Sequence, residues 1–463
     1  MSVPTVDLLA IRRECQELAR AFDAEHRALY LVGGIVGDLV VRAELSPETV
    51  DIDLTTDATP DEIEKIVRPI ADALWTVGKK FGTIGIEIHG RRIEITTHRA
   101  DSYSKDSRKP EVEFSNSITE DLSRRDFTIN AMAIDLIDAD RSLIDPFDGL
   151  SDLAKGVLRT PIAPEISMSE DPLRMLRAAR FIARFSLEVD PSLLDAIHSE
   201  GARLSVVSPE RIRDELSKLL VIEDPTRGLW YLVNTGLFDH FLPEIPALAL
   251  EQDPIHHHKD VLAHTIEVVR RASPKLTLRL AALLHDIGKP RTRQVGPEGV
   301  SFHFHDVVGA KMARKRLVAL HFSTQEIEPV VKLVELHLRF HTYGAGWNDR
   351  AVRRYVRDAG ELLSELNELT LCDATTRNQQ KVQLFRNRME ELERRIAALR
   401  EQEELDSIRP ELNGDEVMEL LGLRPSRAVG EALDFLLEIR LDEGLIGQEE
   451  AQRRLLQWWK DRS

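Results

Sequence analysis

The sequence has 463 residues, of which 42% are hydrophobic and 30% are charged, and its formal net charge is −17. This length is too great for a single hydrophobic core, so we expect three or four domains. The acidic balance excludes a general coat for nucleic acids but leaves room for a local basic groove. The sequence has no apolar run of about 18 residues, no signal-peptide pattern and no disulfide framework, so we expect a cytoplasmic protein without membrane contact.

The N-terminal segment predicts a helix, then a strand, a glycine turn and a second helix. Residues 29–41 form the strand and the start of the second helix, separated by Gly33 and Gly34. A diglycine lets the backbone approach a phosphate closely, with amides free to bind it. Residues 1–28 predict the first helix, whose apolar positions are Leu8, Leu9, Ile11, Leu18 and Phe22.

Two aspartates close together follow the glycine turn. Asp51 and Asp53 stand at i and i+2, and residues with this spacing point to the same side of a strand. Carboxylates on one face can share divalent metal ions, and two Mg²⁺ ions suit the displacement of pyrophosphate from a nucleoside triphosphate. The simpler interpretation is a glycine turn followed by aspartates on the surface.

Residues 81–99 predict a β-hairpin, because apolar and polar side chains alternate on both sides of a His-Gly turn. Glu94 lies on the second strand of this hairpin. It either stands beside Asp51 and Asp53 as a third carboxylate or faces solvent. Polar residues 100–117 then predict a mobile loop.

Arginines mark the next two segments. Arg124 and Arg125 could bind phosphates, or they could form the charged cap of a core helix. A helix predicted to start at Ser169 has no acidic residue between positions 172 and 186, so salt bridges within the helix do not explain its arginines. Spacings of three and four place a stripe of charges on one face, which favours a polyanion site. The stripe consists of Asp171, Arg174, Arg177, Arg180 and Arg184.

A further helix is predicted to start at Ser208. Glu210 and Arg213 on this helix either pair with each other or brace the arginine helix.

Histidines are concentrated later, with ten of the fifteen between His256 and His341. Several of them, together with two aspartates, lie in predicted apolar helices, and His and carboxylate ligands suit transition metals better than Mg²⁺ alone. The predicted ligands are His264, His285, Asp286 and Asp373, and His305 and His337 could complete a site for two metals. After them, residues 376–405 predict a charged helix, and a small helical tail follows Pro410.

Six motifs occur in one order over about residues 28–225: GG…D, DID, SRRDFTINAMA, DPFDG, SEDPLRMLRAARF and ERIRDEL. This series resembles the bacterial class II tRNA nucleotidyltransferase and poly(A) polymerase family, whose head is polymerase β-like. The histidine and aspartate set resembles an HD phosphohydrolase domain. Together these resemblances imply an α+β multidomain fold, with a small β-sheet in the head and an all-α remainder. We expect a head over 1–155, a helical neck and body over 156–250, an HD domain over 251–405 and a tail over 406–463.

The resemblance also implies roles for individual residues. Asp51 and Asp53, with Glu94, would form the catalytic carboxylates that bind Mg²⁺. The nucleotide phosphates would be bound by Gly33 and Gly34 and by an arginine of the Arg124–Arg125 pair. Asp171 and Arg174 would read the Watson–Crick edge of the incoming base, and Arg177 and Arg180 would complete the pocket. One departure is Gly37, which stands where the family usually has an arginine; Arg42 could supply the missing contact.

The implied reaction adds CMP and AMP from CTP and ATP to the 3′ end of tRNA and completes the CCA terminus. The alternatives are a poly(A) polymerase, a partial CC-adding or A-adding enzyme, and a protein that is mainly an HD phosphohydrolase. The long loop at 100–117 resembles that of full CCA enzymes and disfavours a CC-adding one. A Ni²⁺, Co²⁺ or Mn²⁺ ion is expected at the HD site. The oligomeric state, monomer or dimer, is left open by the sequence.

Overall fold

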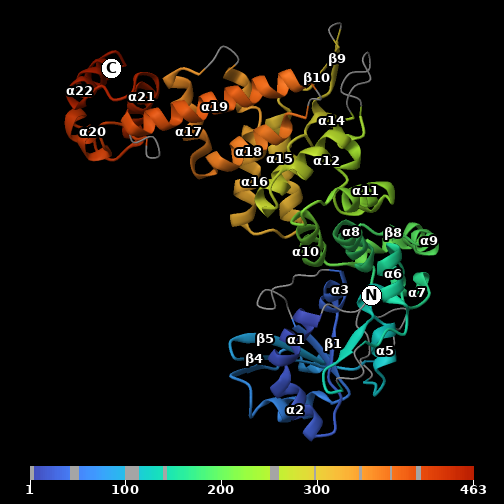
Figure 1. The fold of residues 1–463 in the computed structure, drawn as a ribbon. Helices are drawn as coiled ribbons and strands as arrows, with labels where there is room; N and C mark the ends of the chain where they lie inside the picture. The colour runs from blue at the N-terminus through green and yellow to red at the C-terminus, as the bar shows by residue number, and fades with distance from the viewer. Residues whose placement is uncertain are drawn as a thin grey trace. The chain divides into compact units, whose positions relative to one another are not determined.

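The chain was analysed as a computed structural model, which describes residues 5–41, 52–99, 114–138, 143–250, 260–296, 299–343, 347–375, 378–402 and 408–462. It divides into two compact units, Met1–Phe241 and Leu242–Ser463 (Figure 1). Within the described residues, no helix is both long and apolar enough to cross a membrane.

A six-stranded sheet forms the centre of the first unit, in the order β3-β4-β5-β2-β1-β6. Its strands are β1 (Tyr30–Val32), β2 (Ile52–Thr56), β3 (Ala73–Trp75), β4 (Thr83–Ile88), β5 (Arg91–Thr97) and β6 (Ala133–Asp135). All neighbouring strands are antiparallel except β2 and β5, which are parallel. The predicted hairpin is therefore confirmed as β4 and β5, and its turn consists of His89 and Gly90, both with positive φ.

Four helices pack apolar side chains against one face of this sheet: α1 (Thr5–Glu14), α2 (Gln16–Ala24), α3 (Gly34–Val41) and α4 (Pro60–Val67). The single helix predicted over 1–28 is wrong, because the chain leaves the helical path at Cys15. This break lets α1 and α2 bury Ile11 and Leu18 in the same core, whereas Leu9 is 51% exposed. A capping box formed by Thr59 and Glu62 starts α4.

The rest of the first unit is mostly helical. It contains η2 (Lys79–Phe81), α5 (Ile118–Ser123), η3 (Thr128–Asn130), α6 (Gly149–Lys155), α7 (Pro164–Glu170), α8 (Arg174–Phe185), α9 (Pro191–Glu200), η4 (Gly201–Val206), α10 (Pro209–Leu220), α11 (Thr226–Asn234) and η5 (Leu237–His240), with a short parallel pair, β7 (Val157–Leu158) and β8 (Glu188–Val189).

The predicted helix start at Ser169 is wrong, because Ser169 lies inside α7 and the arginine helix α8 begins at Arg174. Asp171 separates the two helices in an extended conformation, with φ −134° and ψ 95°. The reason is Pro172, since the ring of a proline disfavours the helical conformation in the residue before it.

The second unit begins with η6 (Pro246–Leu248) and a helical domain. Its elements are α12 (Val261–Arg271), α13 (Leu276–Leu284), α14 (Lys289–Thr292), β9 (Gln294–Gly296), β10 (Gly299–Ser301), α15 (His305–Ala319), α16 (Thr324–Leu336), η7 (Arg339–Tyr343), α17 (Asp349–Ala359), η8 (Gly360–Leu362), α18 (Leu363–Asp373) and α19 (Gln379–Gln402). The charged helix predicted over 376–405 corresponds to α19.

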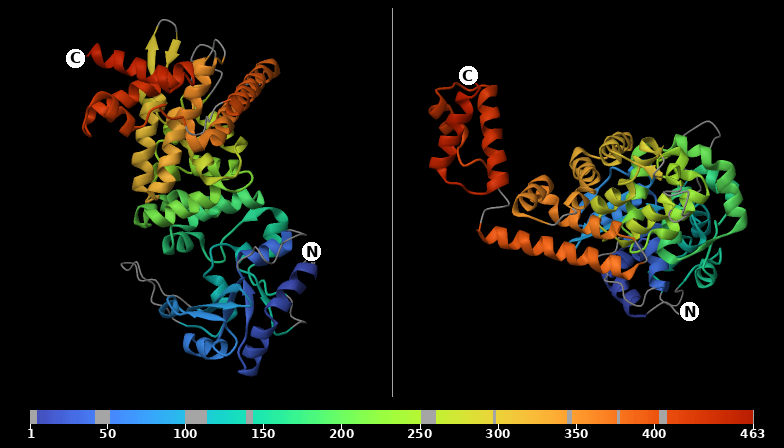
Figure 2. Two further views of the ribbon diagram at one scale, coloured as in Figure 1. Left: turned by 90° about the vertical axis from the view of Figure 1, so that its left-hand side faces the viewer. Right: turned by 90° about the horizontal axis from the view of Figure 1, so that it is seen from above.

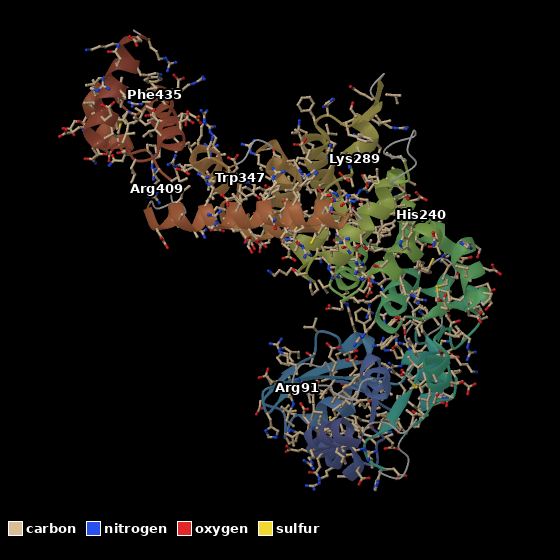
Figure 3. The ribbon with its side chains drawn as sticks, turned by 45° about the horizontal axis from the view of Figure 1, so that its top comes forward. Arg91, His240, Lys289, Trp347, Arg409 and Phe435 are labelled. Carbon is tan, nitrogen blue, oxygen red and sulfur yellow. The ribbon has the colours of Figure 1, made fainter. Side chains whose placement is uncertain are left out.

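The tail has a hydrophobic core of its own, formed by α20 (Gly414–Leu421), α21 (Arg427–Glu443) and α22 (Gln448–Lys460) (Figure 2). The rings of Phe435 and Trp458 stack with centroids 4.8 Å apart and an angle of 13° between their planes (Phe435 is labelled in Figure 3). Trp458 thus packs within the tail.

Ion pairs join α17 to α21. Arg350 Nε lies 2.8 Å from Asp442, and Arg354 Nη2 lies 3.0 Å from the same carboxylate. Arg354 also pairs with Glu438. The contact between these two helices is therefore rich in charge.

Candidate active site and metal centre

Gly33 is the point where three predicted site elements meet. It joins β1 to α3 with φ 84°, a conformation that favours glycine. A Cβ atom placed on it would lie 3.3 Å from Asp53 Oδ2 and 3.9 Å from Arg125 Nη1. The glycine therefore brings backbone, a carboxylate and a guanidinium to one place, as a site for a metal-bound nucleotide requires.

Asp53 and Glu94 are register partners on the parallel strands β2 and β5. Both residues are exposed, whereas Ile52 and Ile93, which precede them, are buried. Register partners in a sheet project from the same face. The structure therefore places Glu94 beside Asp53, and both side chains face solvent. Glu94 is thus both a neighbour of the predicted metal carboxylate and a surface residue, which the sequence analysis treated as alternatives. Asp51 lies outside the described residues.

Arg124 and Arg125 follow α5 and share one buried carboxylate. Arg125 Nη2 donates to Asp121 Oδ2 at 3.1 Å, and Arg124 Nε lies 3.8 Å from Asp121 Oδ1. Burial lowers the pKa of Arg124 to about 9, and the positive charges of three nearby arginines act in the same direction. These three are Arg99, Arg125 and Arg174. An incoming polyphosphate would relieve the mutual repulsion of these positive charges.

The two residues predicted to read the base already form hydrogen bonds with other groups of the protein. Arg174 is 7% exposed, and its Nη1 donates to Ser167 Oγ at 2.7 Å while Nη2 donates to the Arg124 carbonyl at 2.5 Å. Asp171 Oδ2 accepts from Arg211 Nη2 at 2.9 Å. Reading a base with these side chains therefore requires some of these contacts to be exchanged for contacts with the base.

The arginine stripe of α8 is neutralised by acids from other elements. Arg177 Nε donates to Asp126 Oδ2 at 2.7 Å, and Arg180 Nε donates to Glu215 Oε2 at 2.9 Å. Glu215 lies on α10 and is buried, so this residue braces the arginine helix. Sequence reasoning missed this role of Glu215. The available signal was a glutamate on the apolar, buried face of a predicted helix.

Gly37 lies on the buried side of α3. A Cβ atom there would lie 3.3 Å from the carbonyl oxygen of Ile129, which is tighter than an ordinary contact. The glycine therefore lets α3 approach η3 closely. Arg42, the predicted substitute for the missing guanidinium, lies outside the described residues.

Four histidines of the second unit point their Nε2 atoms toward Asp286. The ring Nδ1 atoms of three of them each donate to a backbone carbonyl three residues earlier, which orients each ring so that Nε2 faces the carboxylate. These bonds run from His285 to Ala282 at 2.8 Å, from His305 to Phe302 at 2.7 Å and from His337 to Val334 at 2.6 Å. The fourth ring, His264, bonds Thr375 Oγ1 through Nδ1 at 2.8 Å.

Asp286 is shared by two groups of side chains that could hold a metal ion: His264 and His285 on one side, His305 and His337 on the other. Asp286 Oδ2 lies 3.1 Å from His285 Nε2, and Oδ1 lies 3.4 Å from His305 Nε2. Asp373 Oδ1 lies 2.9 Å from His264 Nε2. All six predicted HD residues therefore come together around one buried carboxylate.

The donor set of this centre fits a metal. Among the described residues, the buried Nε2 atoms of His285, His305 and His337 make no hydrogen bond. Burial lowers the pKa of His337 to about 4, and the charge of His285 adds to this effect, so the His337 ring is neutral at pH 7. Lone pairs directed at carboxylate oxygens are stabilised by a cation between them, and neutral imidazole with carboxylate is a common ligand set for transition metals.

One partner of Asp286 was not predicted. Lys289 Nζ donates to Asp286 Oδ2 at 2.7 Å, and the lysine itself is buried (labelled in Figure 3). Burial would raise the pKa of Asp286, but the positive charges of His285 and Lys289 outweigh it and hold the pKa well below its usual range. The carboxylate is thus ionised and available as a ligand.

Three families match the chain in order. The poly A polymerase head domain matches residues 29–159, the probable RNA and SrmB-binding site of polymerase A matches residues 186–248, and the HD domain matches residues 256–378.

Two relatives from bacteria are similar in sequence. The A-adding tRNA nucleotidyltransferase of Deinococcus radiodurans is 38% identical over 360 residues, which cover 74% of this chain and 80% of the relative. The CCA-adding enzyme of Bacillus subtilis is 37% identical over 267 residues, which cover 58% of this chain and 62% of that enzyme.

Among solved structures, the fold is similar to that of the Bacillus stearothermophilus CCA-adding enzyme in complex with CTP. The TM-score is 0.70 and the sequence identity is 23%, and the match covers 97% of this chain and 98% of the other. This likeness confirms the predicted α+β fold with a polymerase-type head followed by an HD domain.

Proposed function

Because this chain belongs to the tRNA nucleotidyltransferase and poly(A) polymerase family, we propose that it adds CMP and AMP from CTP and ATP to the 3′ end of tRNA. The reaction completes or repairs the CCA terminus without a nucleic-acid template and releases pyrophosphate. The observation that carries this proposal is the meeting of Asp53, Arg125 and the backbone at Gly33. We place the reaction in the cytoplasm, where tRNA and nucleoside triphosphates are available.

Exposed carboxylates on one strand face supply the hard oxygen ligands that Mg²⁺ prefers. Asp53 and Asp51, with Glu94 beside them, would hold Mg²⁺. When bound, the metal lowers the pKa of the 3′-hydroxyl and offsets the charge of the triphosphate. The chain's own share is positioning: Gly33 and Gly34 admit the phosphates, and their amides bind them.

Arg124 and Arg125 would hold the triphosphate and, after transfer, the leaving pyrophosphate. Their crowded positive charges favour the group that carries the most negative charge, which is the triphosphate before the reaction and pyrophosphate after it. Preorganised charge of this kind needs no rearrangement when the reaction occurs and supplies much of the catalysis in such sites.

Base selection would fall to Asp171 and Arg174, which offer an acceptor and a donor fork for the edge of cytosine or adenine. Arg211 bonds Asp171 and would have to release at least one oxygen for the incoming base. Arg177 and Arg180 would set the shape of the pocket through Asp126 and Glu215 rather than touch the base.

A second candidate is an enzyme that adds only the terminal AMP. The observation that favours it is the 38% identity, over 80% of its length, to a relative named as an A-adding enzyme. Both candidates use the same catalytic carboxylates, so they differ only in the nucleotides they accept and in the tRNA end they extend.

The purified chain, supplied with tRNAs that end before C74, C75 or A76, separates the two candidates. Labelled CTP and ATP are given alone and together. A full CCA enzyme extends all three substrates to A76, whereas an A-adding enzyme extends only the tRNA that already ends in CC. Asp53→Asn should abolish addition to every substrate, with unchanged circular dichroism. Addition at the normal rate by this variant would refute the proposed site.

We propose further that the HD centre binds Ni²⁺, Co²⁺ or Mn²⁺ and hydrolyses phosphoesters. Its support is the ionised Asp286, toward which four histidines direct their Nε2 atoms. Metal analysis of the chain and of its His285→Ala/Asp286→Ala variant tests the ligands, and hydrolysis of a 2′,3′-cyclic phosphate tests the activity. An empty centre and no hydrolysis in the parent would reduce this domain to a scaffold.

A further inference from the structure

One row of register partners crosses a face of the sheet in the first unit and ends at a predicted metal carboxylate. Trp75 on the edge strand β3 pairs with Gly85 on β4. Gly85 pairs in turn with Glu94 on β5, which pairs with Asp53 on β2. Register partners project from the same face of a sheet. Trp75 therefore lies on the face that carries the two carboxylates.

The indole of Trp75 covers the glycine that separates it from Glu94. A Cβ atom placed on Gly85 would lie 3.4 Å from Cε3 of the indole. Because glycine has no side chain, the ring can extend along the row over β4. Neighbouring strands lie about 4.8 Å apart, so Gly85, which is two strands away from Asp53, is roughly 10 Å from it. The ring is thus within the length of one nucleoside of the place where a 3′-hydroxyl would react.

Packing of the edge strand does not depend on this indole. Leu74, the neighbour of Trp75 on β3, points to the opposite face and packs against the core of the first unit. Its register partner Ile86 is fully buried in that core. Trp75 itself is 40% exposed. The strand is therefore anchored through Leu74, and Trp75 presents an aromatic surface to solvent, as tryptophans in binding surfaces do.

A guanidinium lies beside the indole. Arg92 precedes Glu94 by two residues on β5 and so projects from the same face. Its guanidinium carbon lies 5.5 Å from the centre of the Trp75 ring, a distance at which a cation is attracted to an indole face. Its Nε lies 3.8 Å from Glu87, and its side chain is 82% exposed. We call Trp75, Gly85 and Arg92 the indole platform.

The position of the indole platform in the sheet indicates which substrate it meets. Gly33 and Arg125, the proposed phosphate site, lie on the β1 side of Asp53, whereas the platform lies on the β3 side, beyond Glu94. In phosphoryl transfer the attacking and leaving oxygens are roughly in line on opposite sides of phosphorus. Pyrophosphate that leaves toward Gly33 requires a 3′-hydroxyl that arrives from the side of Glu94. The platform therefore faces the end of the RNA rather than the incoming nucleotide.

We propose that the indole platform stacks the terminal base of the RNA that is being extended, while Arg92 binds the phosphate that precedes this base. Aromatic side chains stack on any nucleobase, because every base has a π-face, and arginine binds phosphate. A contact without base preference suits an RNA end whose last base changes after an addition. This inference rests on the proposed nucleotide addition and gives Trp75 a direct contact with the RNA.

The test uses a tRNA that ends in CC, which both candidate enzymes extend with ATP. Trp75→Leu keeps an apolar side chain over Gly85 but removes the ring. It should raise KM for the tRNA about fivefold or more and leave KM for ATP unchanged. Trp75→Phe keeps an aromatic face and should restore most of the affinity. Val77→Ala is the matched control, because Val77 is 90% exposed and lies two residues beyond Trp75, and it should change neither KM.

A tRNA whose last nucleotide lacks its base provides the second measurement. Fluorescence anisotropy without ATP should show that the missing base weakens binding to the parent about fivefold or more. The same loss should cost Trp75→Leu nothing further, because the ring that stacks on the base is already absent. Arg92→Gln should reduce the slope of log K against log salt by about 0.7, the value for one phosphate contact on a single strand.

An equal penalty for the missing base in the parent and in Trp75→Leu would overturn the inference. A rise in KM for ATP in place of the tRNA would also overturn it, because the ring would then meet the incoming nucleotide. Failure of the proposed function gives a different result: the parent would add no nucleotide to the tRNA, while anisotropy would still compare the two RNAs on the indole platform.

Discussion

Replacing Asp126 by asparagine removes one charge from the network that joins the Arg124–Arg125 segment to α8. Asp126 is 8% exposed. Its Oδ2 accepts from Arg177 Nε at 2.7 Å, and its Oδ1 accepts from Asn130 Nδ2 and from the Phe127 amide, both at 2.9 Å. The asparagine keeps one acceptor oxygen and places a donor where the other stood, so at least one buried donor loses its partner.

The expected loss of stability follows from these contacts. Breaking a buried ion pair by removing one partner costs about 3–5 kcal/mol. The side chain of Arg177 is 32% exposed, so water offsets part of the loss. We therefore expect Asp126→Asn to lower the free energy of unfolding of this unit by about 3 kcal/mol.

The loss should depend on pH with a definite sign. Burial raises the pKa of Asp126, but the charge of Arg177 and the hydrogen bonds outweigh it, so the pKa in the folded state is lowered. A lowered pKa gives stability that is fully present above the unfolded value, about 3.9, and is lost as the pH falls through the folded value. The difference between parent and variant should thus be constant near neutrality and shrink below about pH 4.

Urea unfolding followed by hydrogen exchange of peptides from the first unit measures this loss separately from the second unit. Arg213→Gln is the matched control, because Arg213 donates to the exposed Asp214 on the same helix. A double-mutant cycle with Arg177→Gln isolates the pair. A loss below about 1 kcal/mol for Asp126→Asn, or additive effects in the cycle, would refute the reasoning.

Three further predictions concern single side chains. Arg211→Gln removes the partner of Asp171 and should raise misincorporation of GTP and UTP relative to CTP and ATP; an unchanged ratio would show that Arg211 has no part in base choice. Gly37→Arg should slow nucleotide addition, because the site has closed around the glycine; a lower KM for nucleotide would contradict this. Gly288→Ala should lower the metal content, because its Cβ would lie 2.1 Å from the His305 carbonyl; full metal occupancy would show that the backbone can adapt.

Elements set by local patterns could be predicted from the sequence. The strand, turn and helix around Gly33 follow from an apolar run broken by glycines, and the hairpin follows from alternation on both sides of His89 and Gly90. Each of these patterns depends on residues within about one element of each other. The boundary between α7 and α8 was missed although it is local, because the effect of Pro172 on Asp171 was read as a helix start rather than a break.

The partners of the arginines could not be predicted in the same way. Arg177 meets Asp126, 51 positions earlier, and Arg180 meets Glu215, 35 positions later. A single sequence carries no signal that pairs these particular charges, since any nearby acid in the fold would serve. The predicted roles of Arg177 and Arg180 in nucleotide binding stay predictions. The alternative is a purely structural role in the ion pairs with Asp126 and Glu215.

The HD ligands were predicted as residue types but not as a geometry. His and Asp on apolar helices indicated a metal; five of the six residues form two possible ligand groups that share Asp286, and Asp373 lies beside His264 and His285. The backbone carbonyls that fix the rings, and the lysine bond from Lys289, depend on the exact turn of each helix and were not visible. Sequence therefore indicates the metal chemistry, while the orientation of the ligands comes from the fold.

The charged contact between α17 and α21 makes part of the attachment of the tail depend on ionic strength, beside the buried bond from Arg353 to the Leu441 carbonyl. Surface ion pairs contribute only about 0–1 kcal/mol each, and their range shrinks from about 8 Å at physiological salt to about 3 Å at 1 M. We expect the tail to loosen from α17 as salt is added, with its own core intact. If small-angle X-ray scattering shows no increase in the radius of gyration across a salt series, these ion pairs do not hold the tail to α17.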